Sequence, residues 1–255
     1  MITLEELREK ARLKRLSLGN AEKDYLLSLL LLSVSRRTKD ELVFKGGTAL
    51  YKFYGLNRFS EDADFSAVKD IDHGKLSACI SSDMKAFGVD CALKSMREPY
   101  NSVVMAFSCR GPLYKGTPLS SSGVRLDINK KSSVDSEPEN RYYSPLYTEI
   151  PGFSLLVMQE PEIAAEKIRA IMTRMKARDV YDLWFLLRKG IKLDKALVTK
   201  KLAYYGHAWD AAAFISRVAA VQAVWEKELA RLLPEVPRFV EVKEFIGSAA
   251  ETWKL

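Results

Sequence analysis

Two aspartates separated by a single residue, Asp62 and Asp64, are the residues of this chain best suited to chemistry. In a β-strand the side chains at positions i and i+2 project from the same face, so both carboxylates would point to one place. Two carboxylates held together repel each other unless a cation joins them, and oxygen ligands of this kind suit Mg²⁺. The pair therefore predicts a magnesium site formed by one strand.

A glycine turn, Gly46-Gly47-Thr48, follows the apolar residues 42–44 and precedes the two aspartates. A glycine turn that runs into a helix offers backbone N–H groups to phosphate. The spacing of a P-loop is absent. Alone, a glycine pair is commonly only a turn, and a D-x-D pair is commonly a solvated surface pair. The order strand, glycine turn, short helix, Ser60-Glu61 and aspartate pair favours metal-dependent phosphoryl or nucleotidyl transfer.

Asp127 is a third candidate carboxylate. The segment 124–129 reads as a strand with Leu126 and Ile128 on one face and Arg125, Asp127 and Asn129 on the other. An aspartate there can be simply an exposed, alternating residue. Because aspartate is disfavoured in strands, its place in the middle of one suggests a functional reason.

Two cations and two carboxylates lie in the helical pattern that follows residue 162. Lys167 and Arg174 are seven residues apart, along the edge of an apolar helix stripe. In one interpretation they bind a triphosphate and stabilise charge on the leaving pyrophosphate. In the other they form a solvated helix edge, and the aliphatic parts of their side chains pack on the stripe. Asp179 suits an N-terminal helix cap. Asp182 lies in a very apolar segment, where a carboxylate normally has a partner.

The composition is that of an ordinary folded protein with an excess of basic residues. Of the 255 residues 47% are hydrophobic and 29% are charged, and 40 Lys and Arg against 33 Asp and Glu give a net charge of +7. This length allows one large domain or two small ones. The positive charge suits a phosphate-rich partner, although many basic proteins bind no nucleic acid.

Histidine and cysteine usage argues against several kinds of site. The chain has two histidines, His73 and His207, so a histidine-dependent triad or a zinc–histidine site is not expected. The three cysteines are widely spaced and lack a metal-ligand pattern, so we expect reduced, mostly buried thiols.

Nothing in the sequence predicts a membrane segment. The first residues carry several glutamates and no apolar stretch of the kind found in signal peptides. The leucine-rich run at 26–34 is too short to span a bilayer. We therefore expect a cytoplasmic protein with no membrane partner.

Periodicity predicts an α/β half followed by a helical half. Asp72 is a candidate N-cap, residues 111–123 and 132–140 read as loops, and a junction is expected near 150–160. The expected helices cover residues 4–15, 21–36, 49–54 and 71–87 and most of the chain beyond 162, and the expected strands cover residues 43–45, 61–66, 90–96, 102–109 and 124–129.

Taken in order, the motifs resemble those of the AbiEii-type nucleotidyltransferases, the toxins of type IV toxin–antitoxin and abortive-infection systems. Nucleotidyltransferases related to DNA polymerase β also place G-[ST] ahead of D-x-D. The resemblance runs from about residue 20 to 190, and the last sixty-odd residues match no motif of the family. It rests on E-K-D-Y at 22–25, F-K-G-G-T-A-L at 44–50, R-F-S-E-D-A-D-F at 58–65, L-D-I at 126–128, and K-x-x-A-x-x-x-R followed by R-D-x-x-D-L at 167–183.

The resemblance implies a fold and a domain division. The fold class is α/β (α+β): an N-terminal half of the polymerase β-like type, built on a mixed sheet, and a helical C-terminal half. Residues 1–155 would form the catalytic domain with its N-terminal helices, and residues 156–255 a helical domain that completes the nucleotide cleft.

It also implies roles for named residues. Mg²⁺ would be held by Asp62, Asp64 and Asp127, with Asp127 acting as general base for the acceptor hydroxyl. Lys167 and Asp182 would join these carboxylates as catalytic residues, with Asp182 orienting a cation or contacting the base or ribose. The NTP would be bound by Gly46, Gly47, Thr48, Ser60, Lys167 and Arg174.

The implied activity is transfer of a nucleotide from an NTP to RNA, notably to the 3′ end of tRNA, by a toxin with an AbiEi-like antitoxin partner. Four lysines, Lys192, Lys195, Lys200 and Lys201, are candidates to guide the RNA backbone. Two alternatives stay open. One is modification of a protein hydroxyl or a small molecule, and the other is a non-catalytic protein that binds NTP and a partner.

Overall fold

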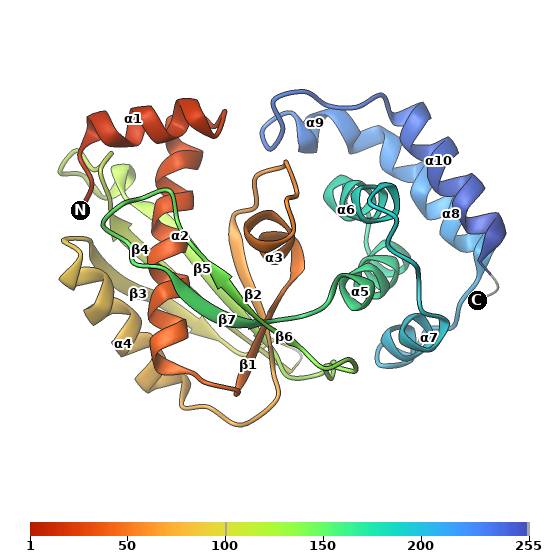
Figure 1. Cartoon of the computed structure of the whole chain (residues 1–255), viewed down its shortest axis with the longest axis horizontal. Coiled ribbons are helices and arrows are strands. Elements are labelled where there is room, and N and C mark those ends of the chain that lie inside the picture. Colours follow the sequence, from red (N-terminus) through yellow and green to blue (C-terminus); the bar gives the residue numbers. More distant parts are fainter. Residues whose placement is uncertain (100, 254–255) are drawn as a thin grey trace. The chain divides into compact units, whose positions relative to one another are not determined.

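The computed structural model describes residues 1–99 and 101–253. The chain divides into two compact units, which we call the sheet unit and the helical unit (Figure 1). The sheet unit comprises Met1–Phe53, Phe59–Val134 and Pro138–Val157. The helical unit comprises Tyr54–Arg58, Asp135–Glu137 and Met158–Leu255, of which the last two residues lie outside the described part.

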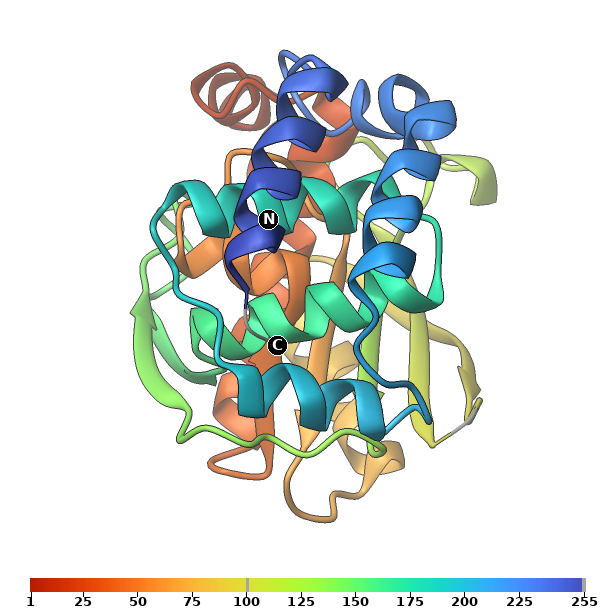
Figure 2. The same cartoon turned by 90° about the vertical axis from the view of Figure 1, so that its right-hand side faces the viewer.

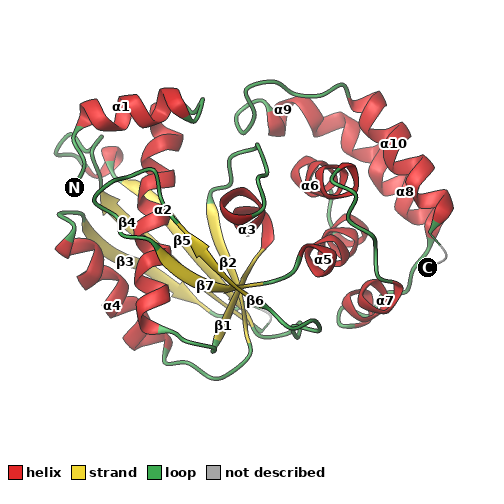
Figure 3. Ribbon diagram, in the orientation of Figure 1, coloured by secondary structure: helices red, strands yellow, loops and turns green. Residues whose placement is uncertain are grey.

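All strands of the described residues belong to the sheet unit (Figure 3). There, seven strands form one mixed sheet in the order β3-β4-β5-β2-β1-β7-β6. Strands β2 and β5 are parallel, as are β1 and β7, and the other neighbours are antiparallel. The strands are β1 (Leu42–Lys45), β2 (Asp62–Ala67), β3 (Asp90–Arg97), β4 (Ser102–Arg110), β5 (Ser122–Asn129), β6 (Glu139–Tyr143) and β7 (Phe153–Val157).

Alternation along the central strands separates an apolar face from a polar one. On β2 the side chains of Ala63 and Phe65 are buried, and on β5 those of Leu126 and Ile128 are buried. The carboxylates alternate with them and are half-buried. Since side chains of a strand point alternately to its two faces, the carboxylates share the face opposite the apolar residues.

Four α-helices belong to the described part of the sheet unit. They are α1 (Leu4–Leu13), α2 (Leu18–Arg37), α3 (Gly46–Phe53) and α4 (His73–Ala86), and a short 3₁₀ turn covers Pro118–Ser120. Helices α2 and α4 contact each other, and α2 also contacts β2 and β5 (Figure 1). The middle of α2, which is rich in leucine, is buried almost all round. Asp72 caps α4 by accepting a hydrogen bond from the backbone N–H of Lys75, which confirms the predicted N-cap.

The helical unit packs its helices around α5 and α6. Helix α5 contacts α6, α7 and α8, and α10 contacts α6 and α8. Figure 2 shows α5 in green with α7 in blue-green as its neighbour. The helices are α5 (Glu160–Thr173), α6 (Ala177–Arg188), α7 (Lys195–Ala203), α8 (Ala211–Ala220), α9 (Trp225–Leu229) and α10 (Phe239–Thr252), with a 3₁₀ turn at Val221–Val224.

The predicted fold class is confirmed: the chain has a mixed α/β architecture with a seven-stranded mixed sheet in the part that is described. The elements expected up to Asn129 are present within a few residues of the predicted bounds. The expected loop 111–123 ends in a 3₁₀ turn and the first residues of β5.

Strands β6 and β7 were not predicted. The β6 sequence, Glu-Asn-Arg-Tyr-Tyr, lacks apolar alternation, and β7 is a five-residue apolar run close to the start of the helical pattern. The expected loop 132–140 ends at Glu139, where β6 begins. Short apolar runs do not distinguish strand from helix by periodicity, so only the pairing of the two segments identifies them.

Helix α3 begins at Gly46, three residues earlier than predicted. The glycine turn is therefore the first turn of the helix itself. Among the described residues, no helix combines the length and the apolar character needed to cross a membrane.

Candidate active site

The three candidate carboxylates of the sheet unit lie on one face of two neighbouring parallel strands. In the register of β2 and β5, Asp64 is the direct partner of Asp127, and Asp62 is the direct partner of Arg125. Paired residues of adjacent parallel strands project from the same face. The structure thus brings together the three carboxylates that the sequence proposed from separate segments.

Two cations belong to the same face. Lys45, the last residue of β1, is the register partner of Asp64 on the side away from Asp127, and it is only 7% exposed. Arg125 donates a hydrogen bond of 2.6 Å from Nη2 to Oδ2 of Asp62. We refer to Lys45, Asp62, Asp64, Arg125 and Asp127 as the carboxylate face.

The Asp127 carboxyl has a raised pKa. Burial raises the pKa of Asp127 above its usual value. A hydrogen bond from Ser102 and the charges of Arg125 and Lys45 act in the opposite direction, and the charge of Asp62 raises the pKa further. A carboxyl with a raised pKa is a better proton acceptor, which suits a general base.

The carboxylate oxygens are hard donors of the kind that Mg²⁺ takes. Within residues 1–99 and 101–253, no three His, Cys, Asp or Glu side chains are grouped closely enough to hold a metal ion. The ion pair of Asp62 with Arg125 gives a reason, because the Asp62 carboxylate is directed to a guanidinium. The carboxylate donors therefore fit a divalent cation. To bind it, Asp62 would have to exchange Arg125 for the cation.

The glycine turn touches this face directly. Gly46 has φ of +75°, and a Cβ atom on it would lie 2.7 Å from Oδ2 of Asp64. Both the backbone conformation and the space therefore require glycine at this position. The first N–H groups of α3 begin next to Asp64, and unpaired N–H groups at a helix start attract phosphate.

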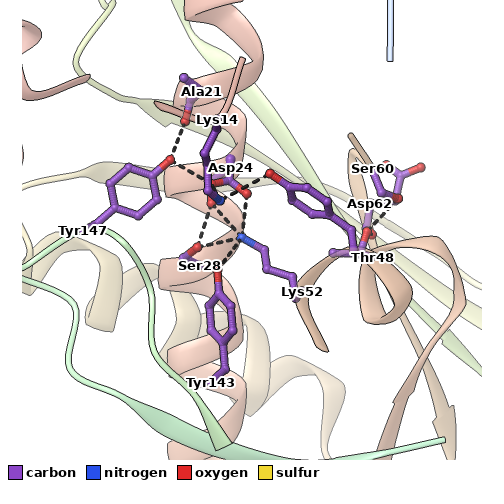
Figure 4. A network of polar contacts seen from close by, with 11 residues as sticks. Lys14, Ala21, Asp24, Ser28, Thr48, Lys52, Ser60, Asp62, Tyr143 and Tyr147 are labelled. Carbon is purple, nitrogen blue, oxygen red and sulfur yellow. Dashed lines mark hydrogen bonds and ion pairs between the residues drawn. The ribbon is translucent and has the colours of Figure 1, made fainter. Parts of the chain in front are cut away.

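Thr48 and Ser60 join the start of α3 to the start of β2 (Figure 4). The buried Thr48 hydroxyl donates to the backbone oxygen of Asp62, and its oxygen lies 2.8 Å from the Ser60 hydroxyl. The hydroxyls of Thr48 and Ser60 are thus engaged with each other, and Thr48 also with the backbone of Asp62. Their observed contact fixes the glycine turn relative to the first aspartate.

A buried ion network anchors the other end of α3 (Figure 4). Asp24 accepts hydrogen bonds from Lys14 at 2.6 Å, from Lys52 at 2.7 Å and from the Tyr147 hydroxyl at 2.8 Å. The side chains of Asp24 and Lys52 are both fully buried. Burial acts to raise the pKa of Asp24, but the charges of Lys52 and Lys14 outweigh it and lower the pKa to about 2.

The other residues of the E-K-D-Y motif also make structural contacts. Glu22 accepts a hydrogen bond of 2.6 Å from the backbone N–H of Leu113 and another from the Ser122 hydroxyl, which holds the segment before β5. Lys23 pairs with Glu61 at 2.9 Å, one residue ahead of the aspartate pair. This motif therefore holds the segment that leads into β5 and contacts the residue that precedes Asp62.

In the helical unit, a second ion network holds three of the predicted site residues. Lys167 lies 3.0 Å from Asp179 and 2.7 Å from Asp182. Arg174 binds Asp179 through two nitrogens, and Arg58 binds Asp182 through two nitrogens. Burial acts to raise the pKa of Asp179, but the Lys167 and Arg174 charges hold it well below its usual range.

Several expectations change here. Asp182 has the expected partner, since Arg58 neutralises it. Asp179 is not the helix cap: α6 has Lys176 at its N-cap, and the Asp179 carboxylate binds cations instead. Lys167 is nearly buried, so the solvated helix edge is wrong for this residue, whereas the Arg174 side chain is 48% exposed.

The lysine group proposed to guide RNA also needs a correction. Lys201 is buried, and it pairs with Glu162 at 2.5 Å and with Asp135 at 3.0 Å. It cannot act from the surface, so the expectation for this residue is wrong. Lys200 is exposed and lies 3.7 Å from Asp135.

Sequence reasoning missed Lys45, Arg125 and Arg58 as parts of these sites. A signal existed for two of them. Lys45 directly precedes the glycine turn, and Arg125 stands two residues before Asp127, on the same strand face. Arg58 is the first residue of the R-F-S-E-D-A-D-F motif, but its partner Asp182 is 124 residues away, so no local pattern indicated this ion pair.

Comparison with known proteins gives a family and a fold. Residues 30–250 match the model of the nucleotidyl transferase AbiEii toxin family of type IV toxin–antitoxin systems. A comparison with curated proteins gives no match.

Similar solved structures include two that cover nearly all of the chain. MenT4, a nucleotidyltransferase toxin of Mycobacterium tuberculosis, aligns with a TM-score of 0.73 at 20% identity, over 100% of this chain and 91% of its own. JHP933 of Helicobacter pylori aligns with a TM-score of 0.57 at 20% identity, over 92% of each chain. At this identity the likeness shows a shared fold.

Proposed function

This chain belongs to the AbiEii family of nucleotidyltransferase toxins of type IV toxin–antitoxin systems, and we propose that it transfers a nucleoside monophosphate from an NTP to RNA. We propose the 3′ end of tRNA as the acceptor and Mg²⁺ as the metal. Family membership makes the chain an NTP-dependent nucleotidyltransferase with an antitoxin partner, and enzymes of this family generally use a divalent metal.

The observation that carries the proposal is the register of β2 and β5. It places Asp64 next to Asp127, with Asp62 on the same face and the start of α3 directly beside Asp64. A phosphoryl-type transfer needs carboxylates for metal ions, donors for phosphate oxygens and a base for the attacking hydroxyl. All three kinds of group are close together on the carboxylate face and at the glycine turn.

Each residue has a role that follows from its contacts. Asp62, Asp64 and Asp127 would hold the divalent cation, which supplies charge stabilisation at the attacking and leaving oxygens when bound. Asp127, with its raised pKa, would accept the proton of the acceptor hydroxyl. Gly46 and Gly47 would offer backbone N–H groups to the β- and γ-phosphates, while Thr48 and Ser60 hold the turn in place.

For the helical unit we propose a role in binding the NTP, on the strength of the family resemblance. Arg174 is the best candidate, because its guanidinium is half exposed although it binds Asp179. Lys167 and Asp182 are more deeply buried and neutralised by their partners. We therefore propose that these two act by positioning the charged groups around them.

The acceptor and the partner are proposed from charge and family. The net charge of +7 favours association with RNA, and the exposed lysines Lys192, Lys195 and Lys200 are candidates to contact its backbone. We propose an AbiEi-like protein as the antitoxin. If changing these three lysines to glutamate leaves RNA labelling unchanged, their proposed contact with RNA is wrong.

The test is a labelling experiment. The protein is incubated with total tRNA, MgCl₂ and each α-³²P-labelled NTP in turn, alongside the Asp64→Asn variant and the control Asp90→Asn. Asp90 is an exposed strand aspartate that pairs with Arg110, so its loss leaves the carboxylate face intact. We expect label on tRNA from one NTP, lost in Asp64→Asn and kept in Asp90→Asn.

Other outcomes identify the alternatives. Label on protein instead of RNA would indicate modification of a protein hydroxyl. NTP binding without label on either would direct the search to small-molecule acceptors or to a non-catalytic role. Label that persists in Asp64→Asn would contradict the proposed site.

A further inference from the structure

Arg125 is the exposed cation of the carboxylate face. It lies on β5 opposite Asp62 and two residues before Asp127, so its side chain projects from the face that bears the carboxylates. Its guanidinium binds Asp62 at 2.6 Å, and its side chain is 46% exposed against 24% for Asp62. Of the two cations of this face, it is the one that can move into solvent.

The neighbouring charges distinguish this pair from an ordinary surface ion pair. Arg110 and Asp90 form a similar cross-strand pair at 2.8 Å on β4 and β3, with both side chains more than half exposed. Asp62, in contrast, shares its face with two further carboxylates, and Lys45 is the other cation there. Without Arg125 three carboxylates would face one lysine, and their mutual repulsion would favour binding of another cation.

Binding of a divalent cation and binding of Arg125 compete for the same carboxylate. A guanidinium carries N–H donors and no acceptor, and its hydrogen bond to Oδ2 of Asp62 engages an oxygen that a metal would use. When it leaves Asp62, it stays tethered to β5 within the same face. A planar guanidinium matches the oxygen pairs of a phosphate group, which makes the triphosphate its natural second partner.

We propose that Arg125 is an exchangeable cation of this site: it neutralises Asp62 until a divalent cation binds there, and it then binds a phosphate of the NTP. The inference rests on the proposed function, since it takes the carboxylate face as the nucleotide site. It adds a residue whose partner changes when the nucleotide binds, and it assigns Arg125 to the triphosphate.

The test measures binding, not turnover. Mn²⁺ binding in the absence of nucleotide and ATP and GTP binding in the presence of Mg²⁺ are measured by titration calorimetry for wild type and three variants. Arg125→Gln removes the charge, Arg125→Lys keeps the charge without the planar fork, and Arg110→Gln removes the matched surface pair. Thermal melting of every variant checks that the fold is kept.

Opposite shifts in the two affinities are expected for Arg125→Gln. Mn²⁺ should bind about two- to fivefold more tightly, because a half-exposed ion pair no longer competes. The NTP should bind about ten- to a hundredfold more weakly, because a charge-assisted hydrogen bond to phosphate is lost. Arg125→Lys should stay near wild type for Mn²⁺ and recover part of the NTP affinity, and Arg110→Gln should change neither.

The inference is overturned if Arg125→Gln leaves either affinity at the wild-type value or weakens Mn²⁺ binding. In that case the wild type still binds Mn²⁺ and an NTP, and the proposed function stands. If the wild-type protein binds neither Mn²⁺ nor an NTP, both the proposed function and the inference fail.

Discussion

Asp64 and Asp127 are more than sixty residues apart in the sequence, yet they are direct neighbours on two parallel strands. Their register, and not their order along the chain, creates the pair of carboxylates at the candidate site. Lys45 flanks Asp64 on the other side, so Asp64 lies between a lysine and a second carboxylate.

Asp127→Asn should abolish nucleotide transfer and make the folded protein more stable at neutral pH. A general base contributes about 10²–10⁴-fold to rate, so a loss in this range or larger is expected. Because burial raises the folded-state pKa of Asp127, its ionised form destabilises the fold as pH rises through the unfolded and then the folded pKa. Urea unfolding at pH 4 and pH 7 should therefore show a stabilising effect that grows with pH. A variant less stable than wild type at pH 7 would contradict this.

Gly46→Ala should displace Asp64 and reduce activity. The substitution places a Cβ 2.7 Å from Oδ2 of Asp64 and requires alanine at a φ of +75°. Gly116→Ala is a matched control, because Gly116 has φ of +83° and nothing within 4 Å of a new Cβ. Both variants should lose about 1–3 kcal/mol of stability from backbone strain. Only Gly46→Ala should lose Mn²⁺ binding in titration calorimetry, and equal Mn²⁺ affinity in the two would refute the close-approach argument.

Asp24→Asn should destabilise the sheet unit strongly. It leaves Lys14 and Lys52 without their carboxylate, and breaking a buried ion pair in this way costs about 3–5 kcal/mol. The lowered pKa of Asp24, about 2, means that the wild type has this stability above the unfolded pKa of 3.8 and loses it as pH falls toward 2. The loss over this window should be about 2 kcal/mol.

Urea unfolding and melting curves between pH 2 and 5 measure this loss. Asp90→Asn is the control, since it breaks an exposed pair and should cost less than about 1 kcal/mol. If Asp24→Asn is as mild as the control, the network of Asp24 does not anchor α3.

Arg174→Gln separates nucleotide binding from stability in the helical unit. Its side chain is half exposed but its partner Asp179 is buried, so the stability loss should be about 1–3 kcal/mol, whereas a lost phosphate contact should weaken NTP binding about tenfold or more. Lys167→Met removes a nearly buried partner of two carboxylates and should lower stability by about 3–5 kcal/mol.

Lys176→Gln is the control for the Arg174 and Lys167 variants, because Lys176 is a half-exposed cation that pairs with Glu228. Calorimetric NTP titrations and urea unfolding give the two readouts. Unchanged NTP binding in Arg174→Gln would remove this residue from the proposed binding site.

Thiol labelling tests the burial of the cysteines. Cys91 and Cys109 are buried opposite each other on β3 and β4, and Cys79 is partly exposed. The hydrogen bond to Cys91 and burial raise the pKa of the Cys109 thiol. Iodoacetamide should therefore modify Cys79 first in the folded protein and all three after unfolding, as read by peptide mass spectrometry. Equal rates at the three sites in the folded protein would contradict the packing of this sheet edge.

Local pattern predicted much of the candidate site. Ala63 lies between Asp62 and Asp64, and Asp127 lies between Leu126 and Ile128. Their assignment to opposite strand faces depends only on the two-residue period of a strand. The N-cap at Asp72 likewise depends on residues within one turn of a helix. Such features are encoded by neighbours in the sequence, so they can be predicted without knowing the rest of the fold.

The tertiary structure decided which of these residues meet and which are neutralised. Strand order placed Asp127 beside Asp64 and Arg125 beside Asp62. The fold also buries Asp24 and Lys201, and each pairs there with an oppositely charged side chain. Strands β6 and β7 were recognisable only through their pairing. These relationships join residues distant in the chain, and their energies depend on register and desolvation, which no local window of sequence contains.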